Sequence, residues 1–142
     1  VYGDPALVLP HICKAEKKIY PVGIVPHYVD YVRVKELYPD YKIIDVLNEN
    51  PLEVAKQISQ CEKIISSSLH GIIAAHAFGI PAAWVKFSKK IKGDGVKFYD
   101  HYACNNIEPI LSSVESPVYQ DVQIDLTEVI NIFKEVAECQ SL

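Results

Sequence analysis

The stretch that decides the fold reads EKIISSSLHGIIAAHAFGIP, residues 62–81. It begins as a short strand at residues 62–66, and the serines at the end of this strand are followed directly by a helix. From Leu69 to Ile80, apolar residues recur with the period of a helix, and Gly79 followed by Pro81 ends that helix. A buried strand that runs directly into a helix is typical of a parallel sheet covered by helices.

The same alternation of strand and helix continues on both sides of this stretch. Further strands are predicted at residues 19–25, 41–46 and 81–87. Further helices are predicted at residues 29–37, from Pro51 after an Asn50 cap, at residues 96–104, and from Asp125 or Thr127 onward. We therefore predict an α/β fold, a Rossmann-like parallel sheet of four to five strands flanked by helices, in a single domain over residues 1–142.

Composition excludes several classes of protein. Hydrophobic residues make up 49% and charged residues 23%, close to the average of soluble globular domains. No run approaches the roughly 18 apolar residues of a membrane-spanning helix. The formal charge is −4 and no basic run is longer than a lysine pair, so nucleic acid is not expected as a partner.

Methionine and cysteine usage bear on the origin of the chain. Methionine is absent and the chain opens at Val1, so we expect a piece of a larger protein.

The four cysteines, Cys13, Cys61, Cys104 and Cys139, are far apart and form no CxxC motif. That pattern favours reduced thiols in a cytoplasmic protein over disulfides, and no metal-binding cluster is expected.

The carboxyl ends of the strands are where a ligand is expected. In open parallel sheets, ligands bind beyond these ends, near the point where the strand order reverses. The polar residues that follow a predicted strand are His27, Asp30, Asn48, Ser66, Ser67, Ser68, His70, Ser88 and Lys89.

The sharpest local signal is the sequence SSSLHG, residues 66–71. Free backbone N–H groups and the positive end of the helix dipole favour an anion there, and Gly71 allows a ligand or neighbouring backbone to come close. His70 in the first turn would accept or donate a proton beside such an anion. The alternative interpretation is that Ser68 only caps the helix and that His70 is a surface residue.

The other histidines differ in context. His27 closes a buried strand at the expected cleft, so it is a candidate for ligand contact or for capping a loop. His76 lies on the apolar stripe and is expected to serve packing rather than catalysis. Residues 92–100 form a glycine-rich turn that opens a helix, and it lacks the ending of a Walker A loop. Its lysines could meet a phosphate, and the alternative interpretation is an exposed Gly-Asp-Gly turn without a ligand.

Four stretches carry a family resemblance: GDPAL at residues 3–7, VGIVPHYVD at 22–30, the serine–histidine helix at 66–81, and GDGVKFYD at 93–100. Together they resemble the polysaccharide pyruvyl transferase family. The resemblance implies the C-terminal half of a two-domain, GT-B-like enzyme whose N-terminal domain is absent from this sequence. Such enzymes transfer the pyruvyl group of phosphoenolpyruvate to two sugar hydroxyls as a ketal, on an exopolysaccharide or cell-wall precursor.

The resemblance also implies roles for individual residues. His70 is expected to be catalytic and, with Leu69, to meet the donor. The other substrate-binding candidates are Ser66, Ser67, Ser68, Gly71, His27, Asp94 and Lys97. Some family members carry arginine where Ser68 stands. No metal and no cofactor are expected, since phosphoenolpyruvate is the donor substrate.

The implied partners are a small-molecule donor, a sugar or polysaccharide-precursor acceptor, and the N-terminal domain, which would bind most of the acceptor. We expect a cytoplasmic protein that meets the inner face of the membrane only through a lipid-linked acceptor, and a fragment that is inactive by itself. Two alternatives stay open: the donor domain of a nucleotide-sugar GT-B glycosyltransferase, for which Asp45 and Glu49 are weak ribose-binding candidates, and a non-catalytic domain that binds polysaccharide precursors.

Overall fold

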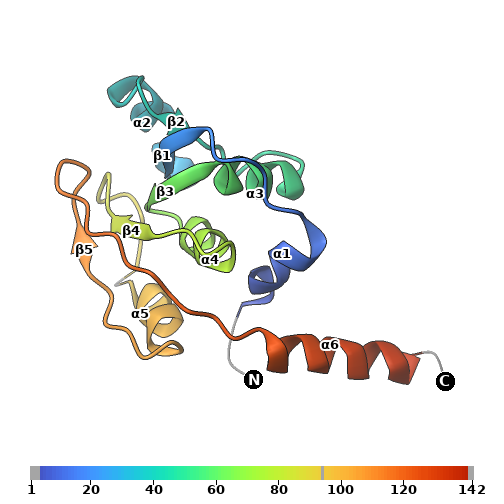
Figure 1. Ribbon diagram of the computed structural model, residues 1–142. Helices are drawn as coiled ribbons and strands as arrows, with labels where there is room; N and C mark the ends of the chain where they lie inside the picture. The colour runs from blue at the N-terminus through green and yellow to red at the C-terminus, as the bar shows by residue number, and fades with distance from the viewer. Residues whose placement is uncertain (1–3, 94, 141–142) are drawn as a thin grey trace.

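A single sheet of five parallel strands organises the protein, and the computed structural model describes residues 4–93 and 95–140 (Figure 1). The strands stand in the order β2-β1-β3-β4-β5. They are β1 (Tyr20–Val25), β2 (Lys42–Ile43), β3 (Cys61–Ser66), β4 (Ala82–Val85) and β5 (Leu111–Ser112). This all-parallel sheet with flanking helices confirms the predicted α/β class.

The helices lie between and around these strands. They are the 3-10 turns η1 (Pro5–Val8) and η2 (Tyr28–Asp30), and the α-helices α1 (Leu9–Ile12), α2 (Tyr31–Leu37), α3 (Pro51–Ser59), α4 (Leu69–Ala77), α5 (Val96–Ala103) and α6 (Thr127–Gln140). Helix α3 begins as predicted, because Asn50 Oδ1 accepts the Leu52 N–H at 3.1 Å and Pro51 follows the cap.

The two faces of the sheet are covered by different elements. Val34 of α2 packs on one face with Ile24 and Ile65, whereas Ile58 of α3 and Ile72 of α4 pack on the other. This division follows from the right-handed crossover rule: the chain moves outward from β1 to β2, then returns past β1 to β3, so the connecting helix changes face.

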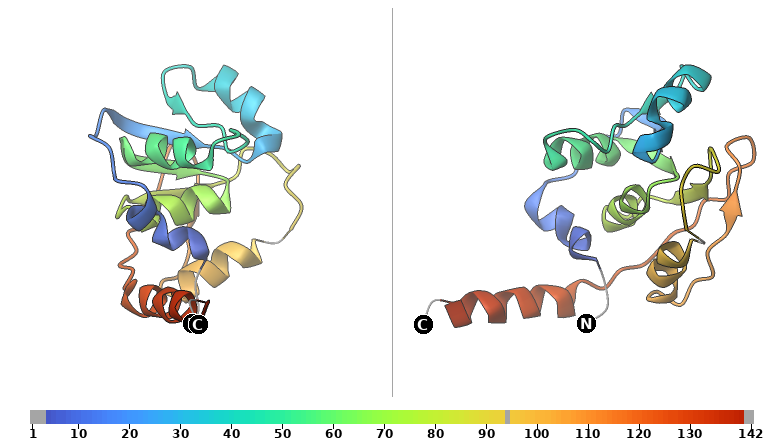
Figure 2. Two further views of the ribbon diagram at one scale, coloured as in Figure 1. Left: turned by 90° about the vertical axis from the view of Figure 1, so that its right-hand side faces the viewer. Right: turned by 180° about the vertical axis from the view of Figure 1, so that it is seen from behind.

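The strand register places the carboxyl ends of the inner strands at one edge. Val25 of β1 pairs with Ser66 of β3, and Ser66 pairs in turn with Trp84 of β4. The residues that follow these three positions therefore enter loops at the same edge of the sheet. Figure 2 shows these loops, together with the start of α4, on one side of the molecule.

Several elements are shorter than predicted. Strand β2 pairs only over Lys42–Ile43, because it is an edge strand and the chain turns at Asp45, whose carboxylate accepts the Leu47 N–H at 2.9 Å. Helix α4 ends at Ala77 rather than Ile80, because Gly79 takes a left-handed φ of 67° and Ile80 donates its N–H back to the Ala75 carbonyl. This is a Schellman-type ending.

Three features were not predicted. The turn η1 and helix α1 precede the first strand, and β5 forms inside residues 105–123, where the sequence has no clear period. Asp4 begins η1 by accepting the Ala6 N–H at 2.8 Å. Helix α6 forms as predicted, but it projects away from the sheet (Figures 1 and 2), and its Val136 is 51% exposed.

Candidate functional site

The strand order reverses between β1 and β3. From β1 the chain leaves to one side of the sheet through α2, and from β3 it leaves to the other side through α4. Two loops that diverge in this way leave room beyond the strand ends, which is where ligands bind in doubly wound sheets. The residues at this point are His27 after β1 and the serines at the end of β3.

A hydrogen bond joins the two loops at the switch point. The His27 N–H donates to Ser67 Oγ at 2.8 Å, and the Ser67 N–H donates to the Val25 carbonyl at 3.2 Å. The half-buried His27 side chain turns back on its own loop, where Nδ1 accepts the Val29 N–H at 3.4 Å. His27 and Ser67 are therefore brought together as predicted, and His27 caps η2.

The three serines have separate surroundings. Ser66 is fully buried, and its hydroxyl contacts the carbonyls of Val25 and Ser68 at 2.8 Å each while accepting the Ser68 N–H at 3.0 Å. This hydroxyl is occupied by backbone. The Ser68 hydroxyl makes no side-chain cap for α4, and within the described residues it has no hydrogen-bond partner. The hydroxyls of Ser67 and Ser68 therefore each keep a proton for a ligand, whereas the hydroxyl of Ser66 is bound to backbone groups.

Gly71 is required by packing inside the protein. A Cβ atom at this position would lie 2.5 Å from Ser66 Oγ and 2.7 Å from Val25 Cγ1. Glycine therefore lets the first turn of α4 sit directly against the ends of β1 and β3. Its neighbour Leu69 is half-buried, and a ligand role for either residue stays a prediction.

His70 is the exposed ionisable side chain of the first turn of α4. Its side chain is 76% exposed, and Nε2 lies 3.9 Å from Asp4 Oδ2. The other oxygen of Asp4 caps η1, so the carboxylate is fixed in place and faces the imidazole. The pair brings one carboxylate and one imidazole from distant parts of the sequence to the same edge of the sheet.

Asp4 was not predicted from the sequence to be a site residue. The sequence places it 66 positions before His70, and its only local signal is an aspartate directly before Pro5, typical of a helix cap. The GDPAL stretch was noted for family resemblance alone. The contact arises because η1 packs against α4.

A cavity of about 260 Å³ opens beside His70. Its wall is apolar apart from His70 and Asn48, and comes from η1, α1, the segment before α3, α3 itself and α4. Asn48 Oδ1 accepts the Asn50 N–H at 2.9 Å, which leaves its amide NH₂ group for other contacts. The cavity suits a small uncharged group held next to the imidazole.

Asp30 is the most unusual buried side chain at this edge. It is 1% exposed, and within the described part of the chain neither carboxyl oxygen has a hydrogen-bond partner. It is the last residue of η2, the turn that His27 caps, so it belongs to the loop that leaves β1 at the switch point. Buried carboxyl groups are normally paired.

His76 lies at the far end of α4 and is 2% exposed. Its Nδ1 is 2.9 Å from His101 Nε2 of α5, and its Nε2 is 3.0 Å from the Gln120 carbonyl. Burial and the neighbouring His101 lower the pKa of His76 to about 4. The packing role predicted for His76 fits this geometry, whereas His101 had no signal in the sequence.

Two further substrate-binding candidates, Lys97 and Asp94, do not lie at the switch point or are not among the described residues. Lys97 is exposed in the first turn of α5, and Asp94 lies outside the described residues. All four cysteines are free, and burial raises the pKa of Cys61 to about 11, which keeps that thiol protonated and poorly nucleophilic.

Residues 4–93 and 95–140 contain neither a metal-binding cluster nor a membrane-spanning helix. No three His, Cys, Asp or Glu side chains in these ranges gather closely enough to hold a metal ion. None of the helices there combines the length and the apolarity that crossing a membrane requires.

Comparison with known proteins shows the family of the chain. The sequence model of polysaccharide pyruvyl transferase matches residues 1–88, which include Asp4, His27, Ser66–Gly71 and strands β1 to β4. The chain belongs to the polysaccharide pyruvyl transferase family. The family match therefore covers the switch point and the His70–Asp4 pair, and ends before α5, β5 and α6.

One curated relative in this comparison is a viral protein. The chain is 44% identical over 115 residues to "Uncharacterized protein L143" of Acanthamoeba polyphaga mimivirus, an alignment that covers 75% of this chain. The chain spans about 40% of the length of that relative. No solved structure matches the chain, and its likeness to one half of a GT-B enzyme stays a prediction.

Proposed function

We propose that this chain is the donor-binding part of a pyruvyl transferase that moves the pyruvyl group of phosphoenolpyruvate onto two hydroxyls of a sugar, forming a ketal. The observation that carries the proposal is the exposed His70, held 3.9 Å from Asp4 in the first turn of α4. Membership of the polysaccharide pyruvyl transferase family supports the reaction class.

The reaction needs a group that can both give and take a proton. Protonation of the methylene carbon of phosphoenolpyruvate makes its central carbon electrophilic. One sugar hydroxyl then adds to that carbon and loses its proton, the C–O bond to phosphate breaks, and a second hydroxyl adds and loses its proton. Of the two protons released, one replaces the proton given to carbon and the other leaves with phosphate.

His70 suits this exchange because a single imidazole can donate to carbon and then accept from a hydroxyl. The Oδ2 atom of Asp4 would face the ring, 3.9 Å from Nε2, during these steps. The apolar cavity beside His70 would hold the methylene group, which becomes the methyl group of the ketal. In this arrangement the methylene carbon of phosphoenolpyruvate would lie next to the imidazole that protonates it.

The start of α4 supplies attraction for an anionic part of the donor. The first N–H groups of a helix have no partner inside the helix, and the helix dipole favours negative charge there. The hydroxyl of Ser68 adds one donor. Preorganised donors of this kind stabilise charge that moves onto a leaving phosphate.

The rest of the active site would come from another part of the whole protein. The chain spans about 40% of the length of its viral relative, so that relative has room for a further domain. In this proposal a second, GT-B-like half of the whole protein binds the sugar acceptor. A lipid-linked acceptor would then bring the enzyme to a membrane surface. A cleft between two halves also excludes water, which would otherwise compete with the sugar hydroxyls.

The test is an assay of the intact protein with phosphoenolpyruvate and a panel of sugars and sugar precursors. The proposal predicts phosphate release that requires an acceptor, and an acceptor product whose mass gains one pyruvyl ketal. Consumption of a nucleotide-sugar with phosphoenolpyruvate left intact would identify a glycosyltransferase instead. Binding of precursors with no turnover of either donor would identify a non-catalytic binding domain.

A further inference from the structure

A second cavity lies beyond the carboxyl end of β4, one strand away from the switch point. Its volume is about 510 Å³, and it is lined by Lys86, Phe87, Ser88, Lys89 and Ile91. Because Ser66 pairs with Trp84, the residues after β4 enter their loop at the same edge of the sheet as Ser67 and Ser68. The cavity therefore belongs to the ligand-binding edge.

The loop around this cavity concentrates positive charge in an acidic protein. The chain carries 18 acids against 14 bases, yet residues 86–97 contain five lysines and one acid. The lysines are Lys86, Lys89, Lys90, Lys92 and Lys97. Within the ranges that the structure describes, none of their ammonium groups is paired with a carboxylate. This charge is available to a ligand.

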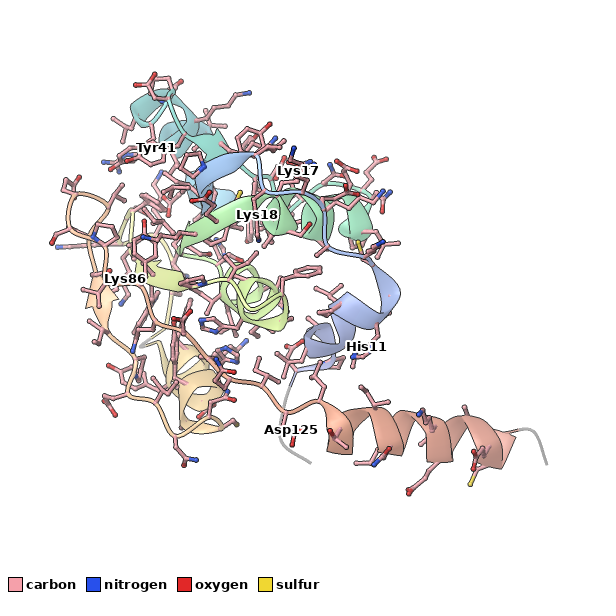
Figure 3. The ribbon with its side chains drawn as sticks, viewed as in Figure 1. His11, Lys17, Lys18, Tyr41, Lys86 and Asp125 are labelled. Atoms are coloured by element: carbon pink, nitrogen blue, oxygen red, sulfur yellow. The ribbon has the colours of Figure 1, made fainter. Side chains whose placement is uncertain are left out.

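The side chain of Lys86, the first lysine of the loop, is held in place by an aromatic ring. Lys86 Nζ lies 5.8 Å from the centre of the Trp84 ring, a cation–π distance, and Figure 3 marks this residue where β4 ends. Trp84 is itself fixed, because Phe98 stacks on it with ring centres 4.6 Å apart and Tyr99 meets it edge-on. The aromatic cluster holds the base of the lysine-bearing loop.

The far end of the loop closes on the same tryptophan. Gly95 takes a φ of 84°, and a Cβ atom there would lie 2.9 Å from Trp84 Cη2. Inside the loop, Ser88 Oγ accepts the Lys90 N–H at 3.2 Å, so the hydroxyl proton stays free to donate to a ligand. The lining of the cavity therefore includes two lysines and one serine, and the loop that carries them contacts Trp84 of the core at both ends.

We propose that this cavity is a phosphate-binding pocket, in which Lys86, Lys89 and Ser88 hold a phosphoryl group of a substrate. Lysine ammonium groups bind phosphate through charge and short hydrogen bonds, and a dianion gains more from two of them than a carboxylate does. The pocket supplies the cationic groups that the start of α4, with Ser68, lacks. Its place in catalysis rests on the proposed pyruvyl transfer, in which the phosphoryl group comes either from phosphoenolpyruvate or from a diphosphate-linked sugar acceptor.

Binding and kinetics of the intact protein test this proposal. Calorimetric titration with inorganic pyrophosphate should show binding that weakens at least about 10-fold in the double variant Lys86→Gln/Lys89→Gln, the scale of two lost charge-assisted contacts. The matched control is Lys14→Gln, which removes an exposed lysine outside the loop and should leave pyrophosphate binding unchanged. Melting temperatures of all variants should equal that of the parent.

Kinetics then separate the two sources of phosphate. A raised KM for phosphoenolpyruvate in the double variant identifies the donor phosphate, and a raised KM for a diphosphate-linked sugar identifies the acceptor. A folded double variant that binds pyrophosphate as the parent does and keeps both KM values overturns the pocket while leaving pyruvyl transfer intact. Lysine-dependent pyrophosphate binding without any turnover of phosphoenolpyruvate supports the pocket and refutes the reaction.

Discussion

His76 Nδ1 lies 2.9 Å from His101 Nε2, which links α4 to α5 through two buried imidazoles. The opposite nitrogen of His76 lies 3.0 Å from the Gln120 carbonyl, which can only accept. His76 therefore carries its proton on Nε2, its Nδ1 accepts, and His101 donates from Nε2. His76 must be neutral for its Nδ1 to accept, whereas His101 donates from Nε2 in either protonation state.

The histidine pair predicts a loss of stability in mild acid. Burial, followed by the charge of His101, lowers the pKa of His76 to about 4, and burial also lowers the pKa of His101. Between about pH 6.5 and the lowered pKa, the unfolded chain binds more protons than the folded one, so the free energy of unfolding falls as pH falls. His76 alone contributes a slope of up to about 1.4 kcal/mol per pH unit.

Urea unfolding of the intact protein across this pH range measures that slope. The variant His76→Gln keeps a donor and an acceptor but does not titrate, so its profile should be flatter than that of the parent between about pH 4 and 6.5. Parent and variant profiles that run parallel over this range would show that the pair does not couple folding to protons.

Gly71 should tolerate no side chain. In Gly71→Ala the new methyl group would sit 2.5 Å from Ser66 Oγ and push the first turn of α4 away from β1. We expect a loss of about 1–3 kcal/mol in the free energy of unfolding, the usual cost of overpacking, together with reduced activity. Chemical denaturation and a turnover assay measure the two effects.

Gly79→Ala is the matched control for Gly71→Ala. Nothing lies within 4 Å of its Cβ position, but its φ of 67° is unfavourable for alanine. It should lose about 1–2 kcal/mol from backbone strain and keep its activity, because it lies far from the first turn of α4. Full stability and activity in Gly71→Ala would contradict the close approach.

Asp30 should contribute nothing to the stability of this part of the protein. Its carboxyl oxygens have no partner in the described ranges, so Asp30→Asn should leave the free energy of unfolding unchanged or raise it by about 1 kcal/mol. Asp45→Asn, which weakens the cap on the Leu47 N–H, should lower stability slightly. A loss of about 3 kcal/mol or more in Asp30→Asn would reveal a buried partner.

Most of the fold could be predicted because its signals are local. The apolar strands, the Asn50-Pro51 helix start and the glycine that ends α4 each act within a few residues. The two-residue strand β5 left no such signal, because its pairing depends on β4, far away in the sequence. Edge strands of this length are determined by tertiary contacts.

The site was predictable only where it follows directly from a strand end. His27, the serines and His70 stand beyond β1 and β3, and the switch-point rule selects them. The separate roles of these residues were not predictable. The Ser66 hydroxyl bonds backbone groups, Gly71 allows close packing, and Asp4 reaches His70 from a distant segment. Those roles depend on packing between elements that the sequence does not encode locally.

His70 and His76 lie on one helix. We propose proton transfer for His70, whereas His76 has a packing role. His76→Ala removes both hydrogen bonds of a buried ring and should lower the free energy of unfolding by about 1–3 kcal/mol, with smaller kinetic effects. His70→Ala removes an exposed side chain 3.9 Å from Asp4, a contact that contributes little to stability. The exposed His11 offers a control, since His11→Ala should change neither property.

The most direct test of the central claim is kcat for His70→Ala in the intact protein at saturating phosphoenolpyruvate and acceptor. The account predicts a fall of about 100-fold or more with an unchanged melting temperature, the scale of a lost acid–base group. A variant that keeps the full kcat of the parent would contradict it, and His70 would then be a surface residue on a well-packed helix start.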